Sequence, residues 1–414
     1  MHTANYTSMT RNNNVITMEL LNHPKCVSDF QYKIFECLNR GWTHIVLRNN
    51  ADRIFPNACL PICGLIRYYQ KRGIEFELDI REDSYLFQCG FDNPFYYDTK
   101  VYYKNFSPLD QIFFYDSIDQ VGKLTQAFVD TVSHEVACAV GVLDGISWCI
   151  NEVMDNVLTH SEVSEGFVMA QLHPQTNRIA FCVYDTGIGI FNSLSNSKHQ
   201  PKTEIDALSL AIQEGVGDGK GQGNGLYGLY QIVHRNGGRL SLTSGNASIM
   251  LRDTGELEKF ERIPCPSKEH RGTIVDFQLD LETNIDIKNA FQSIGGYDGF
   301  DFRIDEMLSD EDEFVHYDVF ENSKGTATRE AGRYLRNDIV NILRREQRGI
   351  ILEFSNVKTV SSSFIDELMA KLFLTLGFVQ FNTLVKISGM NDTVRFLCER
   401  SLYMRIHNEW ELKQ

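Results

Sequence analysis

Three short motifs follow one another in the middle of the chain, and their order constrains the fold more than any other feature. They are Asn151-Glu152-Val153-Met154-Asp155-Asn156, Asp185-Thr186-Gly187-Ile188-Gly189 and Gly221-Gln222-Gly223-Asn224-Gly225-Leu226. Short glycine motifs recur by chance, so each one predicts a structure only where the surrounding strands and helices agree. Here the first motif lies in a helical pattern, the second ends a strand pattern and the third begins a helix.

The first motif lies on a predicted amphipathic helix from about Gly145 to His160. One apolar arc of this helix is expected to lie on a sheet; it consists of Ile146, Ile150, Val153 and Val157. Glu152 and Asn156 are one helical turn apart and share the border of this arc. Because Mg²⁺ prefers hard oxygen ligands, Asn156 is the predicted metal ligand. Glu152 is the predicted general base, a role that contributes roughly 10²–10⁴-fold in rate. A solvated helix edge is the alternative.

The second motif follows a predicted β-hairpin. Two apolar runs, Gly166 to Leu172 and Ile179 to Tyr184, flank a turn-forming segment. The second run ends in Asp185, whose carboxylate can accept a hydrogen bond from an exocyclic amine such as that of adenine. Gly187 and Gly189 would let the backbone approach the ring closely. For these residues taken alone, an ordinary turn is the alternative.

The third motif runs directly into an apolar helix from Leu226 to Val233. Backbone N–H groups at a glycine-rich helix start attract phosphate, assisted by the helix dipole. Thr273, at the start of a predicted strand from Ile274 to Leu279, is a further candidate to reach a nucleotide. A lone loop lysine such as Lys220 is also readily explained as a solvated side chain. The residues predicted to surround the phosphates are Lys220, Gly221, Gly223, Asn224, Gly225 and Leu226.

Together these motifs resemble the GHKL superfamily, the ATP-binding fold of gyrase, Hsp90-type chaperones, histidine kinases and MutL-type ATPases. The resemblance covers roughly Asp116 to Leu281. It implies an α/β sandwich, with a mixed sheet and helices on one face, that binds ATP and Mg²⁺. It also implies that the segment from Asn192 to Lys220 is a mobile lid over the phosphates. The short lid is most similar to the anti-sigma-factor serine kinase branch.

Two histidines near the first motif need separate interpretation. Ser133-His134-Glu135 resembles the phosphoacceptor box of sensor histidine kinases, but it lies too close to Asn151 to belong to a separate dimerisation domain. We therefore expect His134 to be a packed or surface residue of a helix. His160 lies two turns beyond Glu152 on a similar face, where it would either line the nucleotide site or serve a structural role.

A second α/β pattern occupies the C-terminal part of the chain. It follows an acidic run from Ser309 to Glu313, which predicts a solvated linker. Its predicted elements are the strand Val315 to Phe320, the helix Ala327 to Arg345, the strand Ile350 to Phe354, a helix opened by Ser361-Ser362-Ser363, the strand Leu384 to Ser388 and the helix Asp392 to Leu402.

This order resembles STAS domains, the fold of anti-sigma-factor antagonists, and more closely a STAS-like domain joined to GHKL ATPases. In antagonists a serine at the start of this helix is phosphorylated, and Ser362 or Ser363 takes that place here. The usual preceding Asp is Ser361 and the usual following Gly is Phe364, which departs from the pattern. The alternative is an N-cap role for these hydroxyls, worth roughly 1 kcal/mol.

In the N-terminal part of the sequence, apolar runs that alternate with helical stretches predict a βαβαβ arrangement. Its strands are Val15 to Leu20, His44 to Arg48 and Ile74 to Ile80, and its helices are Ser28 to Asn39 and Cys59 to Lys71. It could be a degenerate STAS-like domain, with Pro56-Asn57 where serine would stand. The fold class is thus α/β multidomain, and the predicted parts are this small domain at 1–80, an aromatic-rich connector at 81–115, a GHKL domain at 116–283, an acidic linker at 284–313 and a STAS-like domain at 314–414.

Composition excludes several classes of function. A formal net charge of −15 argues against direct nucleic-acid binding, because such binding rests on clustered Lys and Arg. No apolar run is long enough to span a membrane, and the first residues do not resemble a signal peptide. Ten cysteines without a CxxC pair indicate buried thiols rather than a zinc site or disulfides, which predicts a cytoplasmic protein.

The leading hypothesis is an ATP-binding regulator whose nucleotide state changes its contacts with a STAS-like domain, in the same chain or in a partner protein. Slow ATP hydrolysis and phosphoryl transfer to serine need the same base and metal ion, so the sequence does not separate them. A different class is a non-catalytic scaffold that binds ATP in a stress-response, toxin-control or phage-defence complex. The sequence leaves a homodimer open.

Overall fold

The computed structural model describes residues 8–97, 107–218, 225–261, 272–287, 290, 314–323 and 325–411. The chain forms two compact units. The first holds residues 1–129 and 144–291, and the second holds 130–143 and 292–414. The segment 130–143, which precedes the helix of the first motif, therefore belongs with the C-terminal part of the chain.

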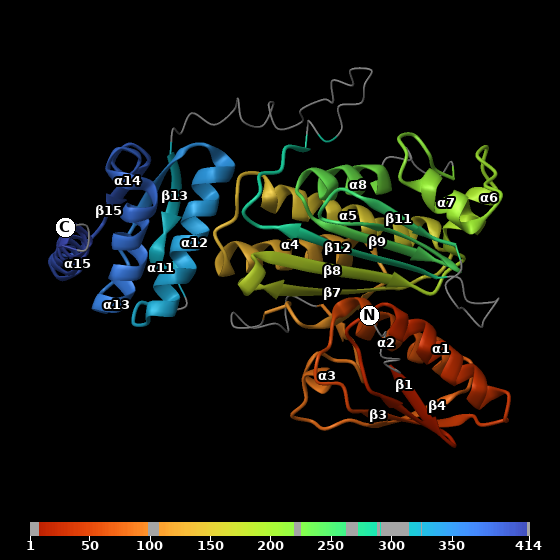
Figure 1. Ribbon diagram of the computed structural model, residues 1–414. Helices are drawn as coiled ribbons and strands as arrows, with labels where there is room; N and C mark the ends of the chain where they lie inside the picture. The colour runs from red at the N-terminus through yellow and green to blue at the C-terminus, as the bar shows by residue number, and fades with distance from the viewer. Residues whose placement is uncertain are drawn as a thin grey trace. The chain divides into compact units, whose positions relative to one another are not determined.

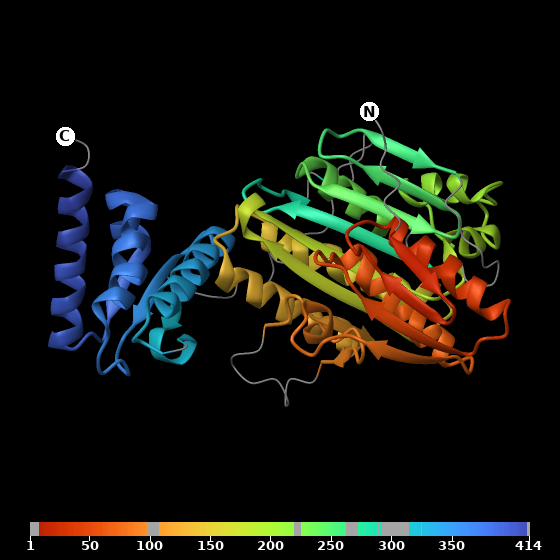
Figure 2. The same ribbon diagram turned by 60° about the horizontal axis from the view of Figure 1, so that its bottom comes forward.

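An eight-stranded mixed sheet lies at the centre of the first unit (Figures 1 and 2). Its strand order is β11-β10-β9-β12-β8-β7-β6-β5, and only β5 and β6 run parallel. The predicted hairpin is confirmed as β7 and β8. The strands are β5 (Phe95–Tyr96), β6 (Ile112–Tyr115), β7 (Gly166–His173), β8 (Arg178–Asp185), β9 (Arg239–Ser244), β10 (Ala247–Leu251), β11 (Leu257–Phe260) and β12 (Thr273–Asp280).

Three helices cover one face of this sheet: α4 (Ile118–Glu135), α5 (Val142–His160) and α8 (Gly225–Arg235). Phe128 of α4 packs edge-on against Phe181 of β8, with ring centroids 5.6 Å apart, and Phe181 stacks on Phe277 of β12 at 5.3 Å. The predicted apolar arc of α5 is confirmed, because Ile146, Ile150, Val153 and Val157 are all buried. The periodicity of this helix thus fixes which of its side chains face away from the sheet.

A second, four-stranded sheet is formed by the N-terminal residues. Its order is β1-β2-β3-β4, with β1 antiparallel to β2 and the other pairs parallel. The predicted strands and helices of this part are confirmed, whereas β1 lies in a polar stretch that the pattern did not mark as a strand. The elements are β1 (Met9–Asn12), β2 (Val15–Met18), α1 (Lys25–Leu38), β3 (His44–Asn49), α2 (Pro56–Gln70) and β4 (Glu75–Asp79).

Helix α2 covers the other face of the large sheet. Nearly all of its first ten residues are buried, and it shares a core cluster with Phe167 of β7 and with Cys182 and Tyr184 of β8. The helix approaches so closely that a Cβ at Gly64 would lie 2.6 Å from the Tyr184 ring. The sequence predicted helices on one face only. Burial of both faces explains why β8 has a continuous apolar pattern instead of an alternating one.

The region 81–115, predicted to be a connector, contains short regular elements. Helix α3 (Tyr85–Gln88) is capped by the Ser84 side chain, and β5 and β6 extend the large sheet. Tyr85 donates a hydrogen bond to Asp110 at 2.7 Å, and Gln171 of β7 donates to both residues. Phe91, which lies in a core cluster, and Phe95, which contacts Phe113 of β6, thus belong to the first unit's own packing.

The second unit is built on a parallel three-stranded sheet with the order β13-β14-β15. Its predicted elements are confirmed, except that the first strand ends at Asp318, whose carboxylate accepts hydrogen bonds from the first turn of α11. The elements are β13 (Phe314–Asp318), α11 (Val319–Asn322), α12 (Arg329–Glu346), β14 (Gly349–Glu353), α13 (Ser362–Ile365), the π-helical turn η2 (Asp366–Ala370), α14 (Lys371–Leu384), β15 (Val385–Ser388) and α15 (Asp392–Glu411).

Candidate functional site

One face of α5 carries three polar side chains at successive turns, Glu152, Asn156 and His160. Glu152 is partly buried, and its pKa is raised above the ordinary carboxyl value, first by burial and second by the nearby charge of Asp155. A carboxylate whose pKa is raised is a better proton acceptor at neutral pH than an exposed one. The helix therefore presents a potential base and a potential cation ligand side by side.

Gly225 at the start of α8 lies directly against this pair. A Cβ placed on Gly225 would be 2.6 Å from the Glu152 Oε2 atom and 3.2 Å from the Asn156 Nδ2 atom. Only glycine fits at this position without displacing the carboxylate. The first and third motifs, far apart in the sequence, thus meet where the backbone N–H groups of a helix start are available to an anion.

The amide of Asn156 is incompletely satisfied. In the part of the chain that the structure describes, its buried Nδ2 atom has no hydrogen-bond partner. Leaving a buried polar group unpaired costs roughly 1–3 kcal/mol. Rotating the amide by half a turn exchanges its nitrogen and oxygen, and would place an oxygen where a cation could use it. Asn156 is therefore suited to contact a bound ligand.

The second motif gathers around Asp185 at the end of β8. Gly187 donates its backbone N–H to Asp185 Oδ1 at 2.7 Å, and Thr273 of β12 donates hydrogen bonds from both its backbone and its side chain. A Cβ at Gly187 would collide with the carbonyl oxygen of Ser161, just after α5. Glycine at 187 thus lets the second motif pack against the end of the helix that carries the first. Gly189 is buried at the start of α6 (Gly189–Ser195).

Asp185 is almost fully buried, at 4% exposure. Burial raises its pKa from 3.8 to about 6, and the hydrogen bonds from Gly187 and Thr273 oppose that rise only in part. A buried carboxylate that accepts hydrogen bonds from fixed backbone groups is costly for the fold alone. Such a group is typical of a site where a ligand supplies a further donor.

The segment between the second and third motifs is held to the site by contacts that the sequence did not predict. Asp218 accepts a hydrogen bond from Ser193 of α6 at 2.9 Å, and its carboxylate lies 2.8 Å from the Nδ1 atom of His160. Glu204 of α7 (Glu204–Ala211) accepts from the backbone N–H of Asn246 at 2.8 Å. His160 thus contacts the predicted lid. The only sequence signal was its position two turns after Glu152.

Leu226 joins a small apolar cluster with Leu194, Ala207 and Ala211 of this same segment. The segment therefore has a core of its own next to the start of α8. Four other residues predicted to surround the phosphates, Lys220, Gly221, Gly223 and Asn224, lie outside the described residues.

The two candidate phosphoacceptors lie in the second unit, at the start of α13. Ser361 is the N-cap residue, because its Oγ accepts a hydrogen bond from the backbone N–H of Phe364 at 3.0 Å. The Oγ atoms of Ser361 and Ser363 are 3.0 Å apart, and Ser362 is exposed. The N-cap role considered for these hydroxyls thus belongs to Ser361, which leaves Ser362 accessible.

His134 does not lie among these site residues. It stacks on Tyr334 of α12 within the second unit, with ring centroids 3.7 Å apart and an angle of 3° between the planes. The prediction that His134 is a packed or surface residue of a helix is confirmed, and the ring stack shows that it is packed.

Comparison with known families agrees with this geometry. The model of the family described as histidine kinase-, DNA gyrase B-, and HSP90-like ATPase matches residues 141–283, which include α5, β8, the start of α8 and β12. The model described as STAS-like domain of unknown function (DUF4325) matches residues 331–395, from α12 to the start of α15. No curated protein matches the chain. None of the described helices is long and apolar enough to cross a membrane.

Apart from residues 141–143, the first match lies in the first unit, and the second match lies in the second unit. The large mixed sheet with its helical layer is the fold expected of the first family. The chain therefore joins a GHKL-type ATPase domain to a STAS-like domain that follows it in the sequence.

Proposed function

We propose that the chain is a regulator that binds Mg-ATP between α5 and α8 and uses its binding and slow hydrolysis to change the contacts of its STAS-like domain. The observation that carries this proposal is the placement of Gly225 against Glu152 and Asn156. It brings a base, an amide and a helix start to one point. A second hydrogen-bonding site lies where β8 ends at Asp185 and β12 begins at Thr273. Here the Asp185 carboxylate accepts hydrogen bonds, whereas the start of α8 donates them.

The nucleotide would lie with its adenine on Asp185 and its phosphates at the start of α8. The Asp185 carboxylate would accept from the exocyclic amine, while the N–H groups of α8 would donate to the phosphate oxygens. Among the described residues, no three His, Cys, Asp or Glu side chains form a ready metal site. Mg²⁺ would therefore be held by Asn156, water and phosphate oxygens, and would neutralise the phosphate charge.

Glu152 would accept the proton of the attacking hydroxyl group. Its partial burial raises its pKa, which makes the carboxylate a stronger base than an exposed one. The attacking group is water in the hydrolysis reaction and a serine hydroxyl in the alternative kinase reaction. Both reactions need the same base, so the acceptor decides which one occurs.

Mass spectrometry after incubation with ATP and Mg²⁺ tests the reaction. We expect released ADP and phosphate in stoichiometric amounts, with no added mass on the chain. Phosphate retained on Ser362 or Ser363 would instead show a serine kinase. Bound ATP that stays intact over many hours would show a scaffold that does not use catalysis.

Asn156→Ala should weaken ATP binding in the presence of Mg²⁺ by at least about tenfold, because a hydrogen bond or ligand contact to a charged group is lost. In EDTA the variant and the wild type should differ much less. Titration of a fluorescent ATP analogue measures both conditions. Asn151→Ala is the matched control, since Asn151 lies on the same helix and contacts Thr125 instead. Equal affinities in Mg²⁺ would remove Asn156 from the site.

A further inference from the structure

One face of α12 binds the end of α4 and the residues that follow it. The last carbonyl groups of an α-helix have no partner within the helix. Here side chains of α12 satisfy them: the donors Arg333, Asn337, Asn341 and Arg344 reach the carbonyl oxygens of Ser133, His134, Glu135, Val136 and Cys138. We call these four donor side chains the α12 dock. All of these residues belong to the second unit.

Asn341 is the centre of the dock. It is buried, and its Nδ2 atom donates to the carbonyls of Ser133 at 2.7 Å and Val136 at 3.0 Å. Its Oδ1 atom accepts from the backbone N–H of Cys138 at 2.8 Å. Asn337, one turn earlier and equally buried, donates to the carbonyl of Glu135 at 3.0 Å. Two buried amides with their hydrogen bonds made fix the register of the bound segment.

Asp338 adds side-chain contacts beside the dock. It accepts hydrogen bonds from Ser133 at 2.9 Å and from Tyr317 at 2.6 Å, and it lies 3.4 Å from the Nε2 atom of His134. Burial alone would raise the pKa of Asp338, but the hydrogen bonds from His134, Tyr317 and Ser133 hold it below its ordinary value. The carboxylate therefore stays ionised at neutral pH and holds the end of α4 in place.

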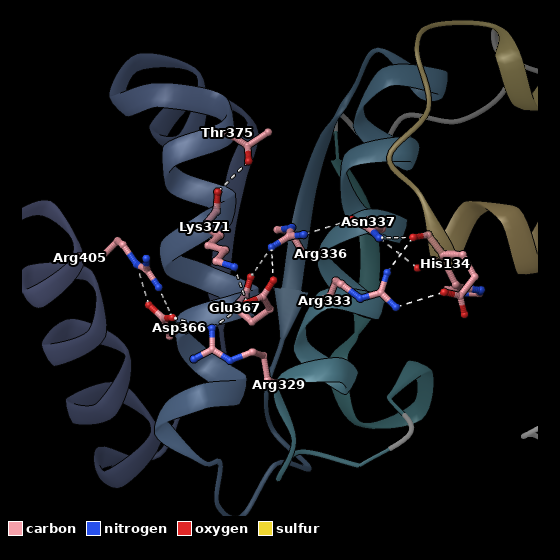
Figure 3. Close-up of polar contacts among 11 residues, drawn as sticks. His134, Arg329, Arg333, Arg336, Asn337, Asp366, Glu367, Lys371, Thr375 and Arg405 are labelled. Atoms are coloured by element: carbon pink, nitrogen blue, oxygen red, sulfur yellow. Dashed lines mark hydrogen bonds and ion pairs between the residues drawn. The ribbon is translucent and has the colours of Figure 1, made fainter. Parts of the chain in front are cut away.

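Another set of side chains fixes α12 to its own domain. Arg336 forms an ion pair with the buried Glu367 at 2.6 Å, and Lys371 and Arg329 approach the same carboxylate at 2.7 and 3.3 Å. Figure 3 shows Arg333 and Asn337 directed toward His134 while Arg336 turns toward Glu367. The dock residues therefore lie on a helix that ion pairs to Glu367 hold to the rest of the STAS-like domain.

The four side chains of the dock are all polar. Around them, α12 also contacts the segment through the Arg333–Glu135 ion pair and the stack of Tyr334 on His134, while Ala137 packs against the apolar core of the second unit and Cys138 is buried. Water can replace hydrogen bonds at a small net cost, whereas exposing apolar surface is expensive. Such an interface suits a contact that opens and closes. The bound segment also leads directly into α5, which begins at Val142 and carries Glu152 and Asn156.

We propose that the α12 dock is the intramolecular receptor through which the STAS-like domain responds to the nucleotide, by holding or releasing residues 133–138. This inference rests on the proposed function, because it needs ATP to bind near α5. The partner of the STAS-like domain is then a segment of the same chain, recognised mainly through its backbone carbonyls. Binding of ATP shifts the balance only if the held and released states differ in ATP affinity.

Hydrogen exchange of the full-length chain tests the proposal. Asn341→Asp keeps the size of the side chain but replaces its donor with an oxygen that faces the carbonyls of Ser133 and Val136. We expect amides of residues 136–143 to exchange at least about tenfold faster, while β14 keeps its protection. In the wild type, Mg-ATP should change exchange in 136–143. Asn382→Asp is the matched control, since Asn382 is exposed on α14 and donates to the carbonyl oxygen of Phe378 in the same helix.

The outcomes separate the two proposals. If ATP binds and is hydrolysed at the same rate in wild type and Asn341→Asp, and exchange of 136–143 does not respond to ATP, the dock is purely structural and the inference is wrong. If the wild type binds no ATP, the proposed function fails first and the inference fails with it. Arg344→Ala, a partly exposed member of the dock, gives the same comparison should Asn341→Asp unfold the second unit.

Discussion

Asp185→Asn should weaken ATP binding at least about 100-fold and should also make the ligand-free protein harder to unfold above pH 6. The loss of affinity follows from the chemistry of the acceptor. The Asp185 carboxylate accepts from Gly187 and from Thr273, and an adenine amine would use its remaining acceptor position. In asparagine one of the two oxygens is an NH₂ group, which donates and therefore opposes a donor directed at that position. A lost hydrogen bond to a charged group costs roughly 1.5–3 kcal/mol, and an unpaired donor adds to it.

The gain in stability follows from the pKa of Asp185. Burial raises it from 3.8 to about 6, so the folded protein binds this proton more tightly than the unfolded chain does. The favourable contribution is complete below pH 3.8 and is lost as the pH rises through 6. Above pH 7 the buried charge therefore costs on the order of 3 kcal/mol. A neutral amide of the same shape avoids the cost of the charge, and the acceptor position that Gly187 or Thr273 loses offsets only part of this gain.

Asp276→Asn is the matched control for this experiment. Asp276 is also buried, its pKa is also raised to about 6 by burial, and it accepts a hydrogen bond from Asn57 of α2. It lies on the side of β12 that faces α2, whereas Phe277 faces the helical layer. Asp276→Asn should increase stability above pH 6 and leave ATP affinity unchanged. Thermal unfolding of the ligand-free protein at pH 5 and pH 8, together with ATP titration, measures both properties.

Two results would contradict the role assigned to Asp185. One is an Asp185→Asn variant that binds ATP as tightly as the wild type. The other is an Asp276→Asn variant that loses ATP affinity as strongly as Asp185→Asn, since that would trace the loss to a general disturbance of β8 and β12.

The elements that bear the motifs were predictable because each has a local pattern. The arc of Ile146, Ile150, Val153 and Val157 gave the orientation of α5, and the two apolar runs around a turn gave β7 and β8. Periodicity of this kind depends only on neighbours in the sequence. It therefore also placed Glu152 and Asn156 on one face. Their meeting with Gly225 followed from the family resemblance and not from any local pattern.

The structural features that the sequence did not predict depend on contacts between segments that are distant in the chain. Nothing local in α2 says that Gly64 approaches Tyr184 of β8, so the second covered face of the large sheet was missed. The contact of His160 with Asp218 joins residues whose spacing carries no signal. The dock was missed for the same reason. In the sequence Asn337 and Asn341 are ordinary polar positions of a helix, and only the structure shows that they bind the end of α4.

Glu152→Gln should bind Mg-ATP nearly as well as the wild type but hydrolyse it roughly 10²–10⁴-fold more slowly. Glutamine keeps the size of the side chain next to Gly225, so the shape of the site is preserved, but it cannot accept a proton. Single-turnover release of labelled phosphate measures the rate, and nucleotide titration measures affinity. Hydrolysis above about one tenth of the wild-type rate would show that another group is the base.

The pH dependence of hydrolysis gives an independent test of the same residue. The pKa of Glu152 is raised, first by burial and second by the charge of Asp155, so the wild-type rate should fall as the pH drops through that raised value. Asp155→Asn removes the second cause while leaving the base in place, and it should shift the fall in rate to lower pH with little change in the maximal rate. Glu152→Gln should show no such fall. If Asp155→Asn leaves the profile where it was, the group that titrates is not Glu152, and its neighbours on α5 must be tested in turn.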